Sequence, residues 1–483
     1  MNACKKILFV FVLALGCVVW ARAGNSSTMG LSVDGERFID SAGRQVIMRG
    51  VCAGSRSKLP PFYPFEPVPD FDTALKAYVD SLAGLGINVV RLLVIYEAAE
   101  PVRGEYDEKY LENYDRMVKA FVARGIRVIV DSHQDVYSRR FCGDGFPDWM
   151  IGEKYRNRPY RSDCTVWELR YFTPAVSDSF RRLWNNVDGV QDRYVEFFAM
   201  LAEKYADEPG VIGFEPINEP VPDFKGMLFY NEWYSESLYK FYEKVADAVN
   251  AVDPRYIVFA DICSFENPGV IRSDRRRPEI KNLAFAPHYY DLGYLKFLWF
   301  NPGGGIESMR KGLGKHAKQA KNWKVPVILT EYGVSMHRDD TEEYITRLYS
   351  VFDEMHLSGT VWEASASEVL WNNRDKGIMD PDAAIREKAI ALDRPYPRAV
   401  AGTVVEFDFE RDLKTFDMKW KEEPDIVSDT VVYVPVRIFG KEPAVSIEPG
   451  SDYRFDCASG ELSIRPLGGA AVRKIEVKAS PEK

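Results

Sequence analysis

The chain has 483 residues, of which 46% are hydrophobic and 28% are charged. This composition is that of a folded globular protein, and it excludes a chain that is disordered along its whole length. The 63 basic and 72 acidic residues give a formal net charge of −9. That balance argues against a nucleic-acid-binding protein, because such proteins use a surplus of Lys and Arg to neutralise phosphates. At about 150 residues per domain, the length predicts two or three domains, or one large barrel with a small companion.

The first 23 residues have the pattern of a secretory signal peptide. Lys5 and Lys6 precede an apolar run, Ile7–Val19, and Ala21–Ala23 supplies an A-x-A cleavage site. The run is shorter than the roughly 20 residues that span a bilayer. We therefore expect cleavage after Ala23 and a secreted or extracytoplasmic protein; the alternatives are an uncleaved anchor and a lipoprotein signal ending at Cys17.

Cysteine usage agrees with export. Of the seven cysteines, five remain once Cys4 and Cys17 leave with the signal peptide. Cys142 and Cys164 lie in one loop-like stretch and could form a disulfide, which an oxidising compartment permits. The others show neither a CxxC motif nor a zinc-type spacing to histidine: Cys52, Cys263 and Cys457. We expect no metal and no other cofactor.

From about Gly43, short β-branched runs alternate with longer amphipathic segments. We expect eight strands at Val46–Val51, Val89–Val94, Val128–Ser132, Val211–Glu219, Ile257–Ala260, Leu283–His288, Val327–Glu331 and Gly359–Ala364. We expect helices at Asp72–Leu85, Glu108–Arg124, Gln191–Tyr205, Glu232–Ala251, Gly305–Trp323 and Thr341–Met355. Eight strands that are each followed by a helix predict an α/β protein with a closed (β/α)8 TIM barrel over residues 30–392. The rival is an open doubly wound sheet, but Gly50–Gly54 is not the phosphate-binding turn that such a sheet requires.

The pattern changes after Leu392. Pro395 and Pro397 interrupt the chain, and short alternating segments follow with turn residues between them: Thr403–Phe409, Val431–Phe439, Tyr453–Cys457 and Ala471–Val477. This pattern predicts a small antiparallel β-sandwich over residues 396–483.

Charged and polar side chains stand at the ends of the predicted barrel strands, where TIM barrels carry their active sites. In chain order these are Arg91, His133, Asp135, Asn218, Glu219, His288, Tyr290, Glu331 and Trp362. Glu219 and Glu331, after strands four and seven, can face each other as the carboxyl pair of a glycosidase does. Arg91 and the Tyr290 hydroxyl would keep one carboxylate ionised, and Asn218 could hold a sugar 2-hydroxyl. Glu215 lies deeper on the fourth strand, and we expect it to be an interior carboxylate.

This order of residues resembles the retaining glycoside hydrolases of the cellulase-type family 5. That family has Arg on strand two, His on strand three, Asn-Glu-Pro on strand four, His-x-Tyr on strand six, Glu on strand seven and Trp on strand eight. The resemblance implies that Glu219 is the acid/base and Glu331 the nucleophile of a double displacement.

Within the family, two segments resemble the endoglycoceramidase group: Asp131–Arg139 followed by Gly143–Trp149, and Arg49–Val51 leading to Lys58–Pro60. Those enzymes cut the bond between an intact oligosaccharide and ceramide. By position, Lys58, Asp135 and Trp362 would contact the first sugars. Pro216, inside the predicted fourth strand, departs from a regular strand pattern.

Two aromatic runs favour a lipid-bearing substrate independently of the resemblance. Tyr289–Phe300 follows the sixth strand and Val221–Tyr234 follows the fourth, and both mix aromatic residues with Leu or Met. An enzyme that accepts an acyl chain needs an apolar channel beside its polar sugar pocket.

We therefore expect a secreted, monomeric, retaining endo-β-glycosidase that acts on glycosphingolipids and makes transient contact with a membrane surface or micelle. The alternatives are a family 5 endoglucanase or mannanase, and a catalytically silent glycolipid-binding protein on the same scaffold.

Overall fold

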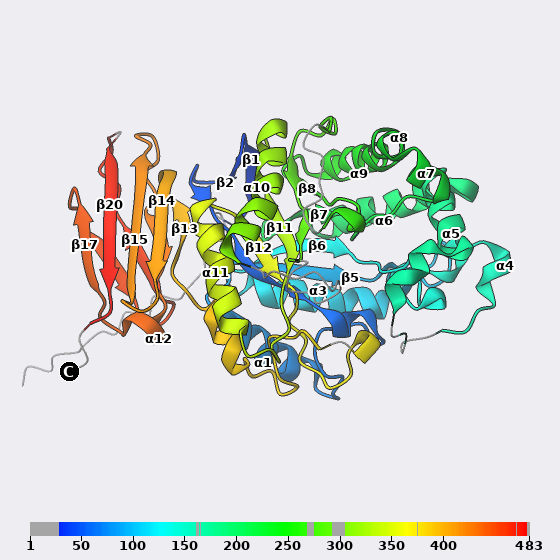
Figure 1. The fold of residues 1–483 in the computed structure, drawn as a ribbon, viewed down its shortest axis with the longest axis horizontal. Coiled ribbons are helices and arrows are strands. Elements are labelled where there is room, and N and C mark those ends of the chain that lie inside the picture. Colours follow the sequence, from blue (N-terminus) through cyan, green and yellow to red (C-terminus); the bar gives the residue numbers. More distant parts are fainter. Residues whose placement is uncertain are drawn as a thin grey trace, which may run out of the picture.

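The computed structural model describes residues 29–160, 164, 166–267, 275–291, 305–373, 375–469 and 471–480. The predicted signal peptide and residues 292–304, which hold most of the second aromatic run, lie outside this part of the chain. A helix-covered barrel stands beside a group of antiparallel strands (Figure 1). Over the residues described, no helix is long and apolar enough to cross a membrane.

The first body is a closed parallel barrel. Its sheet has the order β10-β11-β12-β4-β5-β6-β7-β8-β9. The strands are β4 (Arg49–Ala53), β5 (Val89–Val94), β6 (Arg127–Ser132), β7 (Val211–Glu215), β8 (Ile257–Ala260), β9 (Leu283–Phe285), β10 (His288–Tyr289), β11 (Ile328–Tyr332) and β12 (Ser358–Val361). β9 and β10 are two parts of one predicted strand, and a parallel bridge from Phe285 to Val327 closes the ring. The predicted fold class is confirmed.

Long amphipathic helices cover the barrel. They are α1 (Phe71–Ala83), α3 (Glu108–Val122), α6 (Val190–Lys204), α9 (Tyr239–Val252), α10 (Ile306–Trp323) and α11 (Thr341–Glu354). Asp70 and Asp107 cap α1 and α3 by accepting hydrogen bonds from Thr73 and Tyr110 backbone N–H groups, which satisfies donors that a helix start leaves free. An additional helix, α5 (Pro174–Trp184), begins with the proline that favours a helix start.

Two strands lack the helix that was expected after them. β8 is followed by the 3₁₀ helix Ser264–Glu266, and β12 by the 3₁₀ helices Trp371–Asn373 and Glu387–Leu392 within the residues described. The predicted strand Val211–Glu219 ends at Glu215 because Pro216 has no N–H to continue the ladder. Glu232–Ala251 is not one regular helix: α8 (Tyr230–Trp233) and a π-helical turn, Tyr234–Leu238, precede α9.

The second body is a β-sandwich that also uses the start of the chain. A four-stranded sheet contains β14 (Gly402–Glu410), β15 (Thr415–Glu422), β20 (Val472–Lys478) and β17 (Ala444–Glu448). The facing sheet has the order β1-β2-β3-β13-β16-β19-β18, and its strands are β1 (Leu31–Asp34), β2 (Arg37–Asp40), β3 (Gln45–Val46), β13 (Tyr396–Val400), β16 (Thr430–Tyr433), β19 (Glu461–Ile464) and β18 (Tyr453–Asp456). The predicted strand Val431–Phe439 is instead β16 and a short helix, α12 (Val436–Phe439).

A buried ion cluster joins the barrel to the segment that enters the sandwich. The Asp353 carboxylate, on α11, accepts a hydrogen bond of 2.9 Å from Arg49 Nη2 on β4 and pairs with Arg394, just before β13. All three side chains are buried. Burying a charge without a partner is costly, so each member of this cluster depends on the others.

Replacing Asp353 with Ala is expected to lower the free energy of unfolding by about 3–5 kcal/mol, because two buried guanidinium groups lose their counter-charge. Urea unfolding followed by circular dichroism measures the change. Glu354→Ala is the matched control: Glu354 forms an exposed ion pair with Arg310, and its replacement should cost less than about 1 kcal/mol. A similar small loss of unfolding free energy in both variants would contradict the role assigned to Asp353 in the ion cluster.

Candidate active site

Loops at the C-terminal ends of the barrel strands enclose a cavity of about 720 Å³, within the range of small-molecule sites. Eight of the ten residues predicted for the site line this cavity: Lys58, His133, Asp135, Asn218, Glu219, Tyr290, Glu331 and Trp362. The other two, Arg91 and His288, are fully buried and contact the cavity-lining glutamates. The structure therefore brings all ten residues together.

Glu331, on β11, is held as a carboxylate. Its Oε1 accepts a hydrogen bond of 2.7 Å from Arg91 Nη1, and its Oε2 accepts one of 2.9 Å from the Tyr290 hydroxyl. Burial alone would raise the pKa of Glu331, but the positive charges of His288 and Arg91 outweigh it and lower the pKa to about 2. A carboxylate that stays ionised at this position is suited to nucleophilic attack.

Glu219 follows β7 in a strained turn, with a backbone φ of +42°. Its backbone N–H donates a 2.7 Å hydrogen bond to Asp261 Oδ2, which holds the turn. Its Oε1 lies 2.9 Å from His288 Nδ1 and also accepts a hydrogen bond from Asn267. Burial raises the pKa of Glu219, His288 opposes the shift, and the negative charge of Glu331 adds to it, so the pKa stays above its ordinary value. This environment suits a general acid.

The two carboxyl groups are close together. One oxygen of Glu219 and one of Glu331 lie within 4.8 Å of each other, with His288 between them. Retaining glycosidases hold their two carboxyl groups about 5–5.5 Å apart, whereas inverting enzymes leave about 6.5–9.5 Å for a water molecule. An oxygen–oxygen approach within 4.8 Å is closer to the retaining arrangement than to the inverting one.

His288 and Arg91 supply the counter-charge for the acidic groups of the site. Burial would lower the pKa of His288, but the charges of Asp261 and Glu331 raise it well above the ordinary value. Two groups of side chains have possible metal-ligand atoms that lie within 4.8 Å of one another inside the group: Glu215–Asp261–His288 and Glu219–His288–Glu331. Hydrogen bonds to Arg91 and His288 already engage Glu215, Glu219 and Glu331, so hydrogen bonding accounts for both sets.

A layer of buried polar groups lies below the carboxyl pair. Arg91 donates hydrogen bonds of 2.9 and 2.8 Å to the two oxygens of Glu215 and one of 2.8 Å to Asn218 Oδ1. Glu215 is fully buried, as expected of an interior carboxylate. Asn218 Nδ2 donates to the Gln134 carbonyl at 2.9 Å, which fixes the amide orientation beside Glu219.

The charged side of the cavity combines an ion pair with two indole rings. Lys58 pairs with Asp135, and its Nζ lies 4.6 Å from the ring centroid of Trp362 and 4.3 Å from that of Trp371. Lys58 is therefore buried in the site and is not an ordinary surface lysine. The His133 ring stacks on Trp362 at a centroid distance of 5.4 Å. Charged hydrogen-bonding groups beside indole faces suit the polar edges and apolar faces of sugar rings.

Another part of the cavity lining is an apolar wall, contributed by the 3₁₀ helix Trp167–Phe172, the residue before it and the 3₁₀ helix after β8. Leu169, Phe172 and Phe265 line the cavity and keep 63%, 56% and 39% of their surface exposed. Phe172 stacks on Phe265 at a centroid distance of 5.5 Å. A face with this much exposed apolar surface is suited to an alkyl chain.

The first aromatic run, Val221–Tyr234, does not form that wall. None of its residues lines the cavity. Trp233 and Tyr234 are buried in the core, where Trp233 packs on Trp184. The exposed residues of the run lie on or beside α7 (Phe224–Leu228). The assignment of this run to an apolar channel in the cavity was therefore wrong. The second run falls mainly on residues 292–304, outside the described part of the chain.

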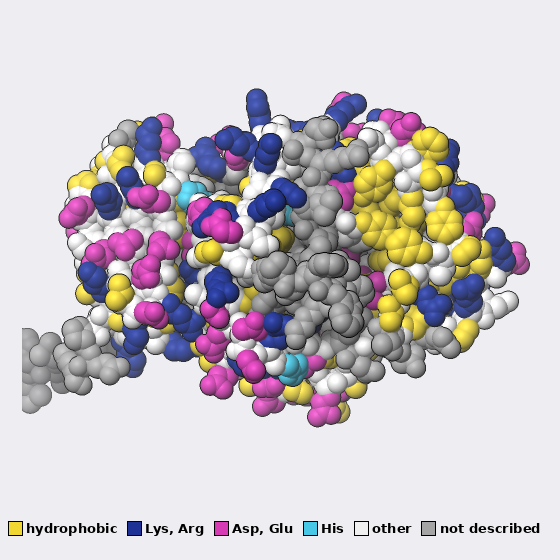
Figure 2. Space-filling view, in the orientation of Figure 1, with side chains coloured by type: hydrophobic (Ala, Val, Ile, Leu, Met, Phe, Trp, Pro, Cys, Tyr) yellow, Lys and Arg dark blue, Asp and Glu magenta, His cyan; other side chains and the backbone are white. Residues whose placement is uncertain are grey.

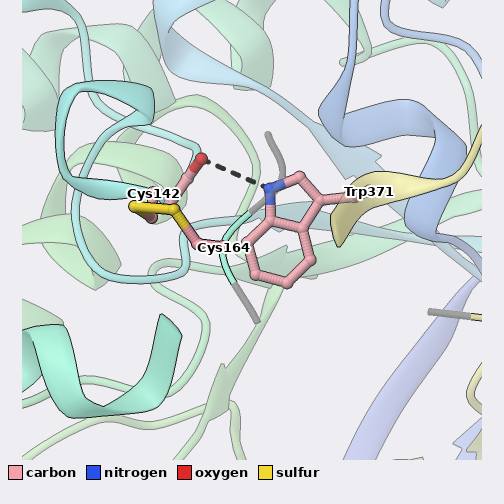
Figure 3. The surroundings of a disulfide bond; sticks show 4 residues. Cys142, Cys164 and Trp371 are labelled. Carbon is pink, nitrogen blue, oxygen red and sulfur yellow. Dashed lines mark hydrogen bonds between the residues drawn. A yellow bond between two sulfur atoms is a disulfide. The ribbon is translucent and has the colours of Figure 1, made fainter. Parts of the chain in front are cut away.

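A disulfide links the apolar wall to the charged side of the cavity. Cys142 and Cys164 are bonded, and the next carbonyl, that of Gly143, accepts a 3.3 Å hydrogen bond from Trp371 Nε1 (Figure 3). Gly143 has no room for a side chain, because a Cβ there would lie 1.7 Å from the Asp135 carbonyl oxygen. The cross-link thus fixes the start of the Trp167–Phe172 segment close to Trp371 and Asp135.

Three residues of the site were missed from the sequence: Asp261, Asn267 and Trp371. Asp261 follows β8 directly, so its place at a strand end was the available signal. Asn267 and Trp371 lie on irregular segments after β8 and β12, and no periodic pattern marks them.

Comparison with known proteins agrees with the fold. The family model described as "Cellulase (glycosyl hydrolase family 5)" matches residues 65–368. The family model described as "Glycoside hydrolase family 5 C-terminal domain" matches residues 394–478. An endoglycoceramidase of Cyanea nozakii is 25% identical over 447 residues, covering 82% of each chain. Endoglycoceramidase I of Rhodococcus hoagii (strain 103S) is 27% identical over 414 residues, covering 80% of this chain and 76% of its own.

A solved structure of endo-glycoceramidase II from Rhodococcus sp. in a cellobiose-like imidazole complex has a TM-score of 0.77 and 25% identity, over 93% of this chain and all of that one. Barrel, sandwich and carboxyl pair together define a glycoside hydrolase. The chain belongs to glycoside hydrolase family 5.

The pKa shifts of the two glutamates predict an asymmetric pH profile for kcat/KM. Glu331, with a pKa of about 2, stays mostly ionised above roughly pH 3, so no fall on the acid side is expected in the ordinary range of a glutamate. Activity should fall as the pH rises through the raised pKa of Glu219, which must carry the proton. Hydrolysis of an aryl β-glycoside measures the profile; an acid limb near pH 4–5 would contradict the charge assigned to Glu331.

Proposed function

We propose that this enzyme is a retaining endo-β-glycosidase that cuts the bond between the oligosaccharide and the ceramide of glycosphingolipids. The observation that carries the proposal is a single cavity with two unlike sides, a charged sugar-facing side and an exposed apolar wall, with the carboxyl pair among its lining. A substrate that joins a glycan to a lipid fits that division. The curated relatives named endoglycoceramidase support the same substrate class.

In the first step, a carboxylate oxygen of Glu331 attacks the anomeric carbon of the sugar next to the lipid. The bond from that carbon to the ceramide oxygen breaks, and Glu219 gives its proton to the departing oxygen. Arg91 and Tyr290 hold the nucleophile in place through its two oxygens. The products of this step are ceramide and a glycosyl ester on Glu331.

In the second step, Glu219 acts as the base. It takes a proton from a water molecule, whose oxygen attacks the anomeric carbon, and the ester bond to Glu331 breaks. Two inversions restore the original configuration in the released oligosaccharide. Asn218, held by Arg91 and the Gln134 carbonyl, is placed to bind the sugar 2-hydroxyl during both steps.

Transient contact with a membrane surface or micelle is part of the proposal. Hydrophobic side chains gather on the face over α7 and α8 (Figure 2). Exposed apolar residues in this part of the chain include Leu169, Phe172, Phe224, Leu228 and Phe229. Large exposed apolar surfaces mark interaction sites, and the first two residues also line the cavity.

We also propose that the protein is exported. The signal-peptide pattern of residues 1–23 supports export, and the bonded pair Cys142–Cys164 is typical of proteins from oxidising compartments.

The test is parallel incubation with lactosylceramide and with soluble cellulose oligomers, with products identified by mass. We expect free ceramide and intact lactose, and no release from Glu331→Ala, which lacks the nucleophile. Added azide should not restore a product of the natural configuration in that variant. Cleavage of the oligomers alone would replace the proposal with the polysaccharide hydrolase; cleavage of neither, with an inactive aryl glycoside assay, would favour the silent binding protein.

Truncating the apolar wall should affect lipid-linked substrates selectively. In Leu169→Ala/Phe172→Ala, KM for lactosylceramide is expected to rise about tenfold or more, since each CH2 group that loses burial costs about 0.8 kcal/mol. The KM for a soluble aryl lactoside should change much less. Leu413→Ala, an exposed leucine of the sandwich, is the control, and equal effects on both substrates would remove the assigned role of the wall.

A further inference from the structure

The acid/base candidate has a second hydrogen-bond partner that nothing in the family motifs marks. Asn267 is 4% exposed and donates from Nδ2 to Glu219 Oε1. His288 Nδ1 lies 2.9 Å from the same oxygen. Because both partners engage Oε1, Oε2 is the oxygen left for the substrate.

We propose that Asn267 is a positioning residue for the acid/base: its amide holds Oε1 of Glu219, directs the other oxygen toward the glycosidic bond, and stabilises the carboxylate that forms when the proton leaves. This inference rests on the proposed function. A carboxylate can only accept hydrogen bonds, so the NH2 end of the amide must face it. Hydrogen bonds to an ionised acceptor are about twice as strong as neutral ones.

The segment that carries Asn267 is anchored by a buried carboxylate. Glu266 accepts hydrogen bonds from the hydroxyls of Tyr230, at 2.6 Å, and Tyr234, at 3.1 Å, and pairs with Arg275. The Tyr234 hydroxyl in turn accepts a 2.9 Å hydrogen bond from the backbone N–H of Cys263. These contacts fix the 3₁₀ helix Ser264–Glu266 at both ends. The two tyrosines belong to the aromatic run after β7, which therefore acts through this segment and not as a lipid channel.

The same short helix also faces the apolar wall. Ser264 and Phe265 line the cavity, and Phe265 stacks on Phe172. Asn267 is therefore two residues from a side chain that an alkyl chain in the cavity would contact. The geometry places the support of the proton donor and the contact for the leaving group on one rigid element.

Any pH effect must be read against the other charges around Glu219. Those facing it are His288 from β10, Glu331 from β11, Asp261 from the end of β8, Asp135 from the loop after β6, and the hydroxyls of Tyr171 and Tyr290. None of them changes in a variant at position 267. Removing the donor leaves the Glu219 carboxylate less stabilised, so its proton is lost at higher pH.

The test compares Asn267→Ala and Asn267→Asp with wild type in pH profiles of kcat/KM, using aryl β-lactosides with good and poor leaving groups. We expect the alkaline limb to move to higher pH in Asn267→Ala and further in Asn267→Asp, where a second carboxylate replaces the donor. On the poor leaving group, which needs the proton most, kcat should fall about tenfold or more. The loss should be smaller on the good leaving group. Asn267→Gln, which keeps the amide donor, should recover part of the activity.

Asn250→Asp is the matched control for the chemical change. Asn250 lies in the last turn of α9, at the end of that helix that leads into the N-terminal end of β8, on the face of the barrel away from the cavity. Asn250→Asp should leave the pH profile of kcat/KM unchanged.

An alkaline limb that stays in place in both Asn267→Ala and Asn267→Asp would overturn the inference. So would equal losses on both leaving groups. Thermal unfolding shows whether either variant is misfolded, and the isosteric Asp variant then decides. Failure of the proposed function is a separate result: wild type would then cleave the aryl lactoside but release no ceramide from lactosylceramide.

Discussion

The buried guanidinium of Arg91 sets the charge balance on which the active site depends. Its side chain is fully buried, and a buried charge is stable only when it is paired and hydrogen-bonded. Arg91 meets that condition with Glu215 beside it and Glu331 toward the cavity, and it also holds Asn218. One strand residue therefore positions the proposed nucleophile, Glu331, and the amide of Asn218 together. Glu215 is given no role in the proposed chemistry, but without it Arg91 would lose two of its hydrogen bonds.

Glu219 and Glu331 show how neighbours can give two chemically identical groups different pKa values. Glu331 is buried and Glu219 is partly buried at the same mouth, and removal from water raises the pKa of each. Glu331 receives Arg91 and the Tyr290 hydroxyl, one on each oxygen, and becomes the stable anion. Glu219 has His288 and Asn267 on one oxygen and faces the negative charge of Glu331. The opposite roles proposed for the two glutamates therefore follow from the placement of a few cations and donors, as in other paired-carboxylate enzymes.

The catalytic framework was predictable because parallel strands all end at one edge of the barrel. Residues far apart in the sequence, such as Arg91 and Glu331, must then converge whatever the loops do. The apolar wall was not predictable in this way. Its segment, Trp167–Phe172, is a 3₁₀ helix tethered near the Cys142–Cys164 disulfide, and neither element has a periodicity that shows which side chains face the cavity. The run Val221–Tyr234 had the right composition, but Trp233 packs into the core against Trp184.

The difference between strand-borne and loop-borne residues also separates the parts of the site that can vary from those that cannot. The charged groups stand on or next to strands whose register the whole barrel fixes, and a shift in one would disturb several others. Leu169, Phe172 and Phe265 stand on short loop-borne helices held by a disulfide, by ring stacking and by Glu266. Loops on a rigid scaffold tolerate change more readily than the scaffold itself. Under the proposed function, preference for the lipid portion of the substrate can therefore change without moving the proposed nucleophile. The segment after β8, which carries both Phe265 and Asn267, is where such a change would reach the proposed proton donor.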